Sequence, residues 1–103
     1  MGLISPLTNK EAFILGFLIA NQKGYGLQLV KASEGSLKRG TVYVTLLRME
    51  EKGYIKSEEE ELPEGDTRPP LRIYKITGKG SAAYDQWTIF VSTVQGNLKL
   101  GRV

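Results

Sequence analysis

Hydrogen-bonding side chains are concentrated between positions 38 and 48 of this 103-residue chain. They carry the cations and hydroxyl groups that contact phosphates and base edges of duplex DNA, and they are Lys38, Arg39, Thr41, Tyr43, Thr45 and Arg48. Hydrophobic residues occur among them and just after them, and we expect these to form a buried back: Val42, Leu46, Leu47, Met49 and Ile55. The pattern predicts a helix that is packed on one side and exposed on the other, as major-groove recognition requires.

Each of these residues also has an ordinary interpretation. Lys38 and Arg39 could form a solvated basic turn rather than neutralise phosphates. Tyr43 could pack on the hairpin that follows the helix. Arg48 could pair with Glu51, although an exposed pair of this kind contributes only about 0.3–0.5 kcal/mol and would not keep the arginine from a phosphate.

The composition argues against several other kinds of site. The chain has no cysteine, which excludes disulfides and thiolate metal sites, and no histidine, which removes the usual general base and metal ligand. We therefore expect a protein that is not an enzyme and that has no catalytic residues, metal or cofactor.

No apolar stretch reaches the roughly 20 residues of a membrane span, and no signal-peptide pattern opens the chain. A cytoplasmic protein without a membrane partner is expected.

The net charge of +3 is unevenly distributed along the sequence. Residues 1–53 hold seven basic and four acidic side chains, whereas residues 54–77 hold four basic and six acidic ones. Positive charge therefore accompanies the candidate helix and the C-terminal segment. Double-stranded DNA is the partner that this distribution favours.

The sequence pattern predicts three helices, a hairpin and a fourth helix. The first helix opens with a capping box, Thr8-Asn9-Lys10-Glu11, and the third ends at Gly53. The expected ranges are 8–20, 27–33, 39–52, 54–61, 71–76 and 81–94. Thr77 is a plausible N-cap for the last helix, although Gly78 and Gly80 weaken its first turn. This order is that of a winged helix-turn-helix, an α+β fold that is mainly α. We expect residues 1–80 to form the DNA-binding domain and residues 81–103 a dimerisation helix and frayed tail, all in one compact domain.

The hairpin carries both signs of charge. Arg68 and Arg72 could reach a groove or a phosphate, but they could equally belong to an ordinary charged hairpin, because Glu58–Glu61 and Asp66 would repel DNA if they faced it. We expect these carboxylates to face solvent or to pair with the two arginines. A metal site is a weaker interpretation, since consecutive residues of a strand point to alternate faces.

The last helix has an apolar stripe at helical spacing, formed by Ala83, Trp87, Phe90, Val91 and Val94. Because the winged helix offers this stripe little to pack on in its own chain, we expect a homodimer that forms through it. Trp87 could instead stack on a flat ligand between two subunits. An aromatic anchor in the dimer interface is the simpler role for it.

Three segments of the chain resemble the PadR-like family of transcriptional regulators. The first combines Leu15–Leu18 with Gly24–Leu29, and the second is Gly40–Ile55, which is similar to the family's recognition helix. The third runs through the hairpin from Arg68-Pro69 to Lys79-Gly80. The sequence departs from the family at Lys38-Arg39, where Ser-Pro is common, and at Thr67, where the wing usually has glycine.

The resemblance implies a homodimeric repressor that binds DNA. In the family, C-terminal helices form the dimer, and some members release DNA when a small aromatic or hydrophobic compound binds. We therefore expect a sequence-specific regulator that acts on a pseudo-palindromic operator, with such an effector left open. A winged-helix module that binds protein and a DNA-binding protein without sequence preference are the alternatives.

Overall fold

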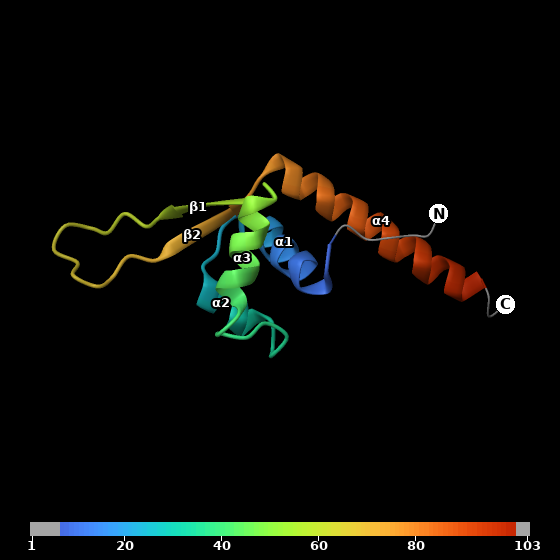
Figure 1. Cartoon of the computed structure of the whole chain (residues 1–103), viewed down its shortest axis with the longest axis horizontal. Helices are drawn as coiled ribbons and strands as arrows, with labels where there is room; N and C mark the ends of the chain where they lie inside the picture. Colours follow the sequence, from blue (N-terminus) through green and yellow to red (C-terminus); the bar gives the residue numbers. More distant parts are fainter. Residues whose placement is uncertain (1–6, 101–103) are drawn as a thin grey trace.

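The fold consists of three helices, a two-stranded hairpin and a long final helix, in a computed structural model that describes residues 7–100 and the side chains of residues 7–94. The elements are α1 (Asn9–Asn21), α2 (Gly26–Ala32), α3 (Val42–Glu51), β1 (Ile55–Glu59), β2 (Arg72–Ile76) and α4 (Gly78–Leu100). The hairpin and α4 project from opposite sides of the body formed by α1, α2 and α3 (Figure 1). The predicted winged helix-turn-helix with a fourth helix is confirmed.

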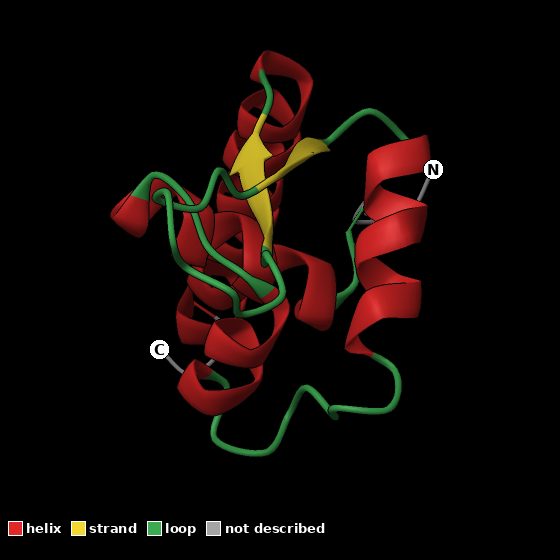
Figure 2. Cartoon of the chain, turned by 90° about the vertical axis from the view of Figure 1, so that its left-hand side faces the viewer, coloured by secondary structure: helices red, strands yellow, loops and turns green. Residues whose placement is uncertain are grey.

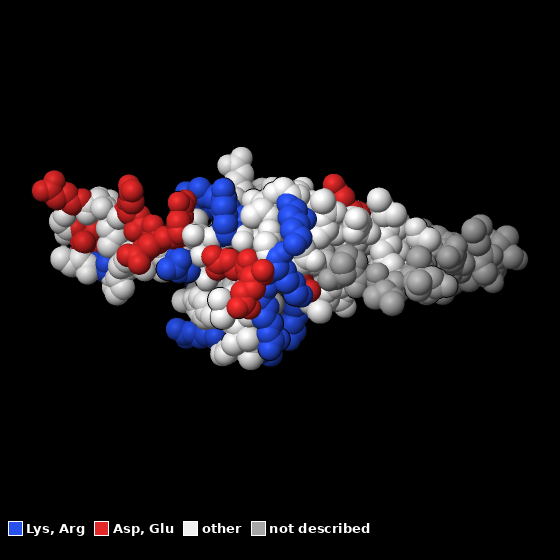
Figure 3. Space-filling view, turned by 45° about the horizontal axis from the view of Figure 1, so that its top comes forward, with Lys and Arg blue, Asp and Glu red and all other residues white. Residues whose placement is uncertain are grey.

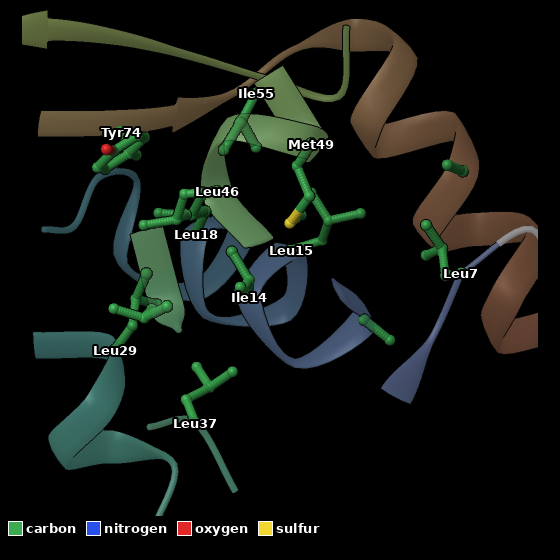
Figure 4. Close-up of a cluster of buried hydrophobic side chains, with 13 residues drawn as sticks. Leu7, Ile14, Leu15, Leu18, Leu29, Leu37, Leu46, Met49, Ile55 and Tyr74 are labelled. Carbon is green, nitrogen blue, oxygen red and sulfur yellow. The ribbon is translucent and has the colours of Figure 1, made fainter. Parts of the chain in front are cut away.

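The hydrophobic core lies where α1 and α3 meet the base of the hairpin. Its side chains come from all three helices of the body and from β1, and they point toward one another (Figure 4). The largest fully buried ones are Ile14, Leu15, Leu18, Leu29, Val42, Leu46, Met49 and Ile55. Helix α1 is covered on most sides, as its apolar sequence predicted, although Ile19 near its end is exposed.

The N-terminus of α1 is held by the predicted capping box. The backbone N–H of Glu11 donates to Thr8 Oγ1 at 3.1 Å, and the N–H of Thr8 donates to Glu11 Oε1 at 2.9 Å. Lys52, just past the end of α3, donates from Nζ to the second carboxylate oxygen of Glu11 at 2.8 Å. This carboxylate therefore caps one helix and also ties it to another.

Helix α3 ends at the predicted glycine. Gly53 has a φ of +83°, and its N–H donates to the carbonyl of Glu50, while the N–H of Tyr54 donates to the carbonyl of Met49. This pair of bonds is the Schellman arrangement, which requires a residue in the left-handed region. The chain enters β1 directly afterwards.

The sheet is small and antiparallel, with Ile55 paired to Ile76 at its base and Glu59 paired to Arg72 at the outer end. The loop between α1 and α2 joins its edge, because Gly24 and Tyr74 exchange two backbone hydrogen bonds of 3.1 and 2.8 Å. Figure 2 shows how little of the molecule the sheet occupies beside the helices. Its function in the fold is to connect α3 to the hairpin loop and to α4.

The junction between the sheet and α4 is tightly packed. Thr77 Oγ1 accepts a hydrogen bond from the N–H of Gly80 and donates one to the carbonyl of Gly53. Gly80 lies so close to the carbonyl of Tyr54 that a methyl group at this position would overlap it. The helix begins at Gly78, directly after Thr77, which caps it as predicted, and the glycines of its first turn allow this close approach.

Helix α4 differs from its prediction in two ways. It continues to Leu100, so the expected frayed tail from Gln95 is wrong for residues 95–100, and residues 101–103 lie outside the described part. Its first half packs on α1, where the Tyr84 ring lies against Gly16, so this half has a partner in its own chain. None of the described helices is long and apolar enough to cross a membrane.

Candidate nucleic-acid interface

Helix α3 is attached to the body through one side only. Val42, Leu46 and Met49 are fully buried there. The helix begins at Val42 rather than at residue 39, because the carbonyl of Lys38 accepts hydrogen bonds from the N–H groups of Thr41 and Val42 and closes a turn. Lys38 and Arg39 are exposed in this turn, directly before the helix.

Leu47 does not belong to the buried back, contrary to the prediction. Its side chain is 57% exposed, and Val44 is 49% exposed. Adjacent residues of a helix lie about 100° apart, so Leu46 and Leu47 cannot both point into a core as narrow as this one. The spacing of Val42, Leu46 and Met49 defines the buried stripe, and Leu47 is left on the outer face.

The predicted contact residues Thr41, Thr45 and Arg48 lie together along one edge of α3. With Val44 and Lys52 they form one wall of an open cleft of about 490 Å³, and the start of α1 forms the other wall. Thr41 and Arg48 are exposed, and Thr45 is half-buried. The cleft adds Lys10 and Lys52 to the candidate surface. Sequence reasoning missed Lys10 because only the fold brings α1 beside α3. Lys52 lies four positions after Arg48, so helical spacing could have found it.

The cations of this surface include several without an internal counter-charge. Among the side chains that the structure describes, no ion pair involves Lys38, Arg39 or Arg48. The alternative in which Arg48 pairs with Glu51 is therefore not what the structure contains. These three charges are available to an external anion.

Tyr43 occupies the opposite edge of α3 from the cleft. Its ring lies over Gly26 at the start of α2, so closely that a methyl group on this glycine would overlap it. The expected alternative of packing on the wing is therefore replaced by packing on α2. About half of the tyrosine side chain remains exposed beside the helix.

The wing arginines are engaged within the hairpin. Arg68 donates from Nη1 and Nη2 to the two carboxylate oxygens of Glu60 at 2.8 and 3.1 Å, and its Nε lies 3.4 Å from Asp66 Oδ2. The hydrogen bond from Arg68 holds the pKa of Glu60 below its usual value, and the same bond raises the pKa of the guanidinium. Arg72 donates to Ser57 Oγ at 3.1 Å.

The acidic run on β1 is also paired in part. Lys75 lies 3.0 Å from Glu58, and this hydrogen bond lowers the pKa of the carboxyl group. Figure 3 shows acidic side chains gathered over the hairpin and basic ones mainly over the helical body. Within the described residues, no group of three or more carboxylates is placed to hold a metal ion.

The predicted dimer residues of α4 fall into two groups. Ala83 is only 7% exposed and belongs to the core of its own chain. The others are partly exposed along the rest of the helix, and they are Trp87, Phe90, Val91 and Val94. Ile89, which the sequence pattern did not single out, is 66% exposed. Trp87 stacks on Tyr84 with ring centroids 5.8 Å apart.

A second hollow lies between α1 and α4. It has a volume of about 580 Å³, and its apolar wall includes Phe13, Phe17, Tyr84 and Trp87. The predicted ligand residue Trp87 therefore faces a groove within one chain. Small residues of α1, including Gly16, keep this groove open.

Solved structures with the same fold include several regulators. The YusO protein from Bacillus subtilis matches with a TM-score of 0.75 at 16% identity, over 91% of this chain and 62% of the YusO chain. A transcriptional regulator from Clostridium thermocellum matches with a TM-score of 0.70 at 26% identity, over 87% of this chain and 86% of its own. A PadR family transcription regulator from Clostridium difficile matches with a TM-score of 0.68 at 26% identity, over 88% and 98%.

The sequence itself matches a protein family. A search of curated proteins found no match. The model of the transcriptional regulator PadR-like family matches residues 14–86, which include α3, the wing and the start of α4. The match covers most of the chain and agrees with the resemblance carried by Gly40–Ile55. The chain therefore belongs to the PadR-like family of transcriptional regulators.

Proposed function

We propose that this regulator is a sequence-specific repressor whose helix α3 enters the major groove of duplex DNA. The observation that carries the proposal is the division of α3 into a fully buried back and an exposed outer surface with unpaired cations at both ends. A helix with side chains is about 10–12 Å across, and the major groove is about 12 Å wide. The helix is therefore of a size to enter the groove.

Each predicted residue has a role in this proposal. Arg48 and Thr41 lie on the exposed edge of α3 beside the cleft and would contact base edges, while Lys38 and Arg39 would neutralise phosphates beside the start of the helix. Thr45 and Tyr43 lie on opposite edges of the helix and would contact the sugar–phosphate backbone. Lys10 in the cleft has no ion-pair partner among the described side chains and would face the second phosphate strand, whereas Lys52 is paired with Glu11.

The wing has a secondary role. Arg68 and Arg72 could approach the flanking minor groove, but Arg68 would first have to leave Glu60 and Asp66. Exchanging one charged partner for another gains little free energy at an exposed site. We therefore assign most of the binding energy to α3 and its neighbours.

We propose further that two chains join through α4. The exposed apolar residues of its outer half, including Ile89, would be covered in such a dimer. Two α3 helices related by a two-fold axis would then read half-sites about one turn of DNA apart, roughly 34–36 Å. Ile89→Asp should shift the chain toward the monomer in analytical ultracentrifugation without lowering its helix content. A profile identical to that of the wild type would contradict this interface.

The groove beside Trp87 supports a site for a flat, hydrophobic effector. Its volume of about 580 Å³ falls in the range of small-molecule sites, and aromatic rings line it. Because Trp87 is the only tryptophan, its fluorescence reports directly on this groove. Titration with 1-naphthol should quench the emission saturably, and Phe17→Ala should weaken that binding. Linear, unsaturable quenching would argue against an effector site here.

Selection of bound sequences from random duplex DNA tests the main proposal. A regulator of this kind should enrich a two-fold symmetric motif, and transcription from a promoter that carries the motif should fall when the protein is added. Enrichment of no sequence, despite binding, would favour a DNA-binding protein without sequence preference.

The acidity of the wing favours one competing function, a winged-helix module that binds protein. Binding to duplex DNA separates the two ideas, because phosphate contacts make the affinity fall steeply with added salt. If no binding to duplex DNA were measurable at 50 mM salt, the protein-binding function would replace the regulator proposed above.

A further inference from the structure

The outermost face of α3 carries two apolar side chains. Val44 is 49% exposed and Leu47 is 57% exposed. Both lie among the basic and hydroxyl side chains of the candidate surface, Val44 before Thr45 and Leu47 before Arg48. Each lies two positions from a fully buried residue, Val44 from Leu46 and Leu47 from Met49. Two positions along a helix correspond to a rotation of about 200°, so both side chains point almost directly away from the core.

The surroundings of this apolar pair restrict what could cover it. Single exposed hydrophobic residues are common, but these two are neighbours at a spacing of three and so form one patch. Arg48 is next to Leu47 in the sequence, and the turn with Lys38 and Arg39 precedes the helix. Neither Arg48 nor these two cations has an ion-pair partner among the described side chains. A partner for this face must therefore present small apolar groups in the middle and negative charges on both sides.

The major groove of duplex DNA has this combination at thymines. The C5-methyl group of thymine is the apolar group that a base pair displays on its major-groove edge, and phosphates border the groove on both sides. Aliphatic side chains contact this methyl group, whereas they gain nothing from the hydrogen-bonding edges of a G·C pair.

We propose that Val44 and Leu47 read thymine methyl groups, so that each half-site contains A·T pairs opposite these two residues. The proposal rests on the function proposed above. Residues three apart are separated by about 4.5 Å along a helix, and base pairs are stacked about 3.4 Å apart. The two thymines should therefore occupy neighbouring or next-but-one base pairs. Leu47 and Val44 are then specificity-determining residues beside Arg48, while Lys38 and Arg39 supply affinity through phosphates.

Replacing thymine by uracil tests this inference, because uracil pairs identically and lacks only the methyl group. In the selected duplex, each thymine of one half-site is replaced in turn and the affinity of the full-length chain is measured. We expect one or two positions at which uracil weakens binding by roughly fourfold, the value of one buried methyl group. Uracil at the remaining positions should change nothing.

Two variants assign the positions to residues. Leu47→Ala should bind thymine and uracil equally at one position while keeping the preference at the other, and Val44→Ala should show the reverse. Both side chains are exposed, so both variants should fold normally. Ile19→Ala, which truncates an exposed apolar residue at the end of α1, is the matched control and should keep both preferences.

The outcomes separate this inference from the function beneath it. If the wild type binds the selected duplex but does not distinguish thymine from uracil anywhere, the methyl contacts are absent and the regulator remains. If the preference exists but both alanine variants keep it, another group senses the methyl and the inference is overturned. If no duplex is bound or selected, the proposed function itself fails.

Discussion

Helix α3 and the wing both carry arginine and lysine, but the two regions use them differently. The cations at the two ends of α3 include Lys38, Arg39 and Arg48, none of which has an ion-pair partner among the described side chains. The wing cations Arg68 and Lys75 are bonded to Glu60 and Glu58 of the same hairpin. Net charge alone would not separate a binding surface from a self-neutralised one.

The two regions are also held in different ways. The back of α3 is held by hydrophobic burial, whereas the outer part of the hairpin is held by exposed ion pairs and a turn between Pro63 and Asp66. Burial of a leucine stabilises a fold by about 2–5 kcal/mol relative to alanine, and an exposed ion pair contributes about 0–1 kcal/mol. A recognition surface must keep its side chains in fixed positions, and the buried side of α3 provides the larger stabilisation for this.

The largest effect should come from removing that support. Leu46→Ala leaves a cavity behind α3 and should lower the free energy of unfolding by about 2–5 kcal/mol. Glu60→Gln breaks the bidentate pair of the wing, which lies in solvent, and should lower it far less. Urea denaturation of both variants measures the difference. Equal losses would mean that the wing is as firmly held as α3.

The next effect concerns DNA binding. Replacing Lys38 and Arg48 by alanine should weaken binding to the selected duplex by about 2–4 kcal/mol, which is roughly 30- to 1000-fold, because base and phosphate contacts are lost together. Arg68→Ala with Lys75→Ala removes the same charge from the wing and should weaken it less than about threefold. Fluorescence anisotropy with labelled duplex gives both values. A wing variant as defective as the α3 variant would reverse the comparison.

A smaller effect should follow from releasing the wing cations. Glu58→Gln with Glu60→Gln removes the counter-charges of Lys75 and Arg68 and should strengthen DNA binding by about three- to tenfold at low salt. The slope of log affinity against log salt should become steeper by up to about two, one for each released cation that reaches a phosphate. An unchanged slope would mean that the wing does not reach the duplex.

The smallest effect concerns a buried carboxylate beside α3. Burial alone would raise the pKa of Glu11, but hydrogen bonds from Lys52 and Thr8 outweigh it and hold the pKa below 4.5. Since the folded state binds this proton less readily than the unfolded chain, its contribution is present above pH 4.5 and is lost as the pH falls through the lowered value. Glu11→Gln keeps the cap and should lower stability by about 1 kcal/mol at pH 7.

The control for this prediction is an exposed carboxylate in the wing. Glu58→Gln removes a pair that lies in solvent and should change stability little at any pH between 3 and 7. The difference between Glu11→Gln and the wild type should shrink steadily as the pH falls below 4.5, as followed by thermal denaturation. A difference that persists there would place the effect in packing rather than in charge.

Much of the fold was predictable because local signals agreed with one another. The capping box at Thr8, the glycine after α3 and the alternating β2 each act within a few residues, so their physics is visible in the sequence. The winged helix-turn-helix followed from the order of these elements. The cap of α4 at Thr77 was predictable for the same reason, whereas the contact of Gly80 with Tyr54, a residue far away in the chain, was not.

The candidate site was only partly predictable. Helix α3 contains two apolar pairs at helical spacing, Val42 with Leu46 and Val44 with Leu47, and the sequence alone does not say which pair faces the body. The partners of Arg68 were anticipated as a class, because acidic residues lie on the same hairpin. The contribution of Lys10 could not be foreseen, since it depends on how α1 is placed beside α3.

The tight junction at Gly80 has a consequence for regulation. Because the backbone of Gly80 lies against the Tyr54 carbonyl, a tilt of α4 at this junction would be passed on to the end of α3. A helix of 23 residues is about 35 Å long, so a tilt of about 5° displaces its far end by about 3 Å, close to the rise of one base pair. In the proposed dimer, a small molecule bound between the two α4 helices would thus be enough to move the α3 helices out of register with their half-sites.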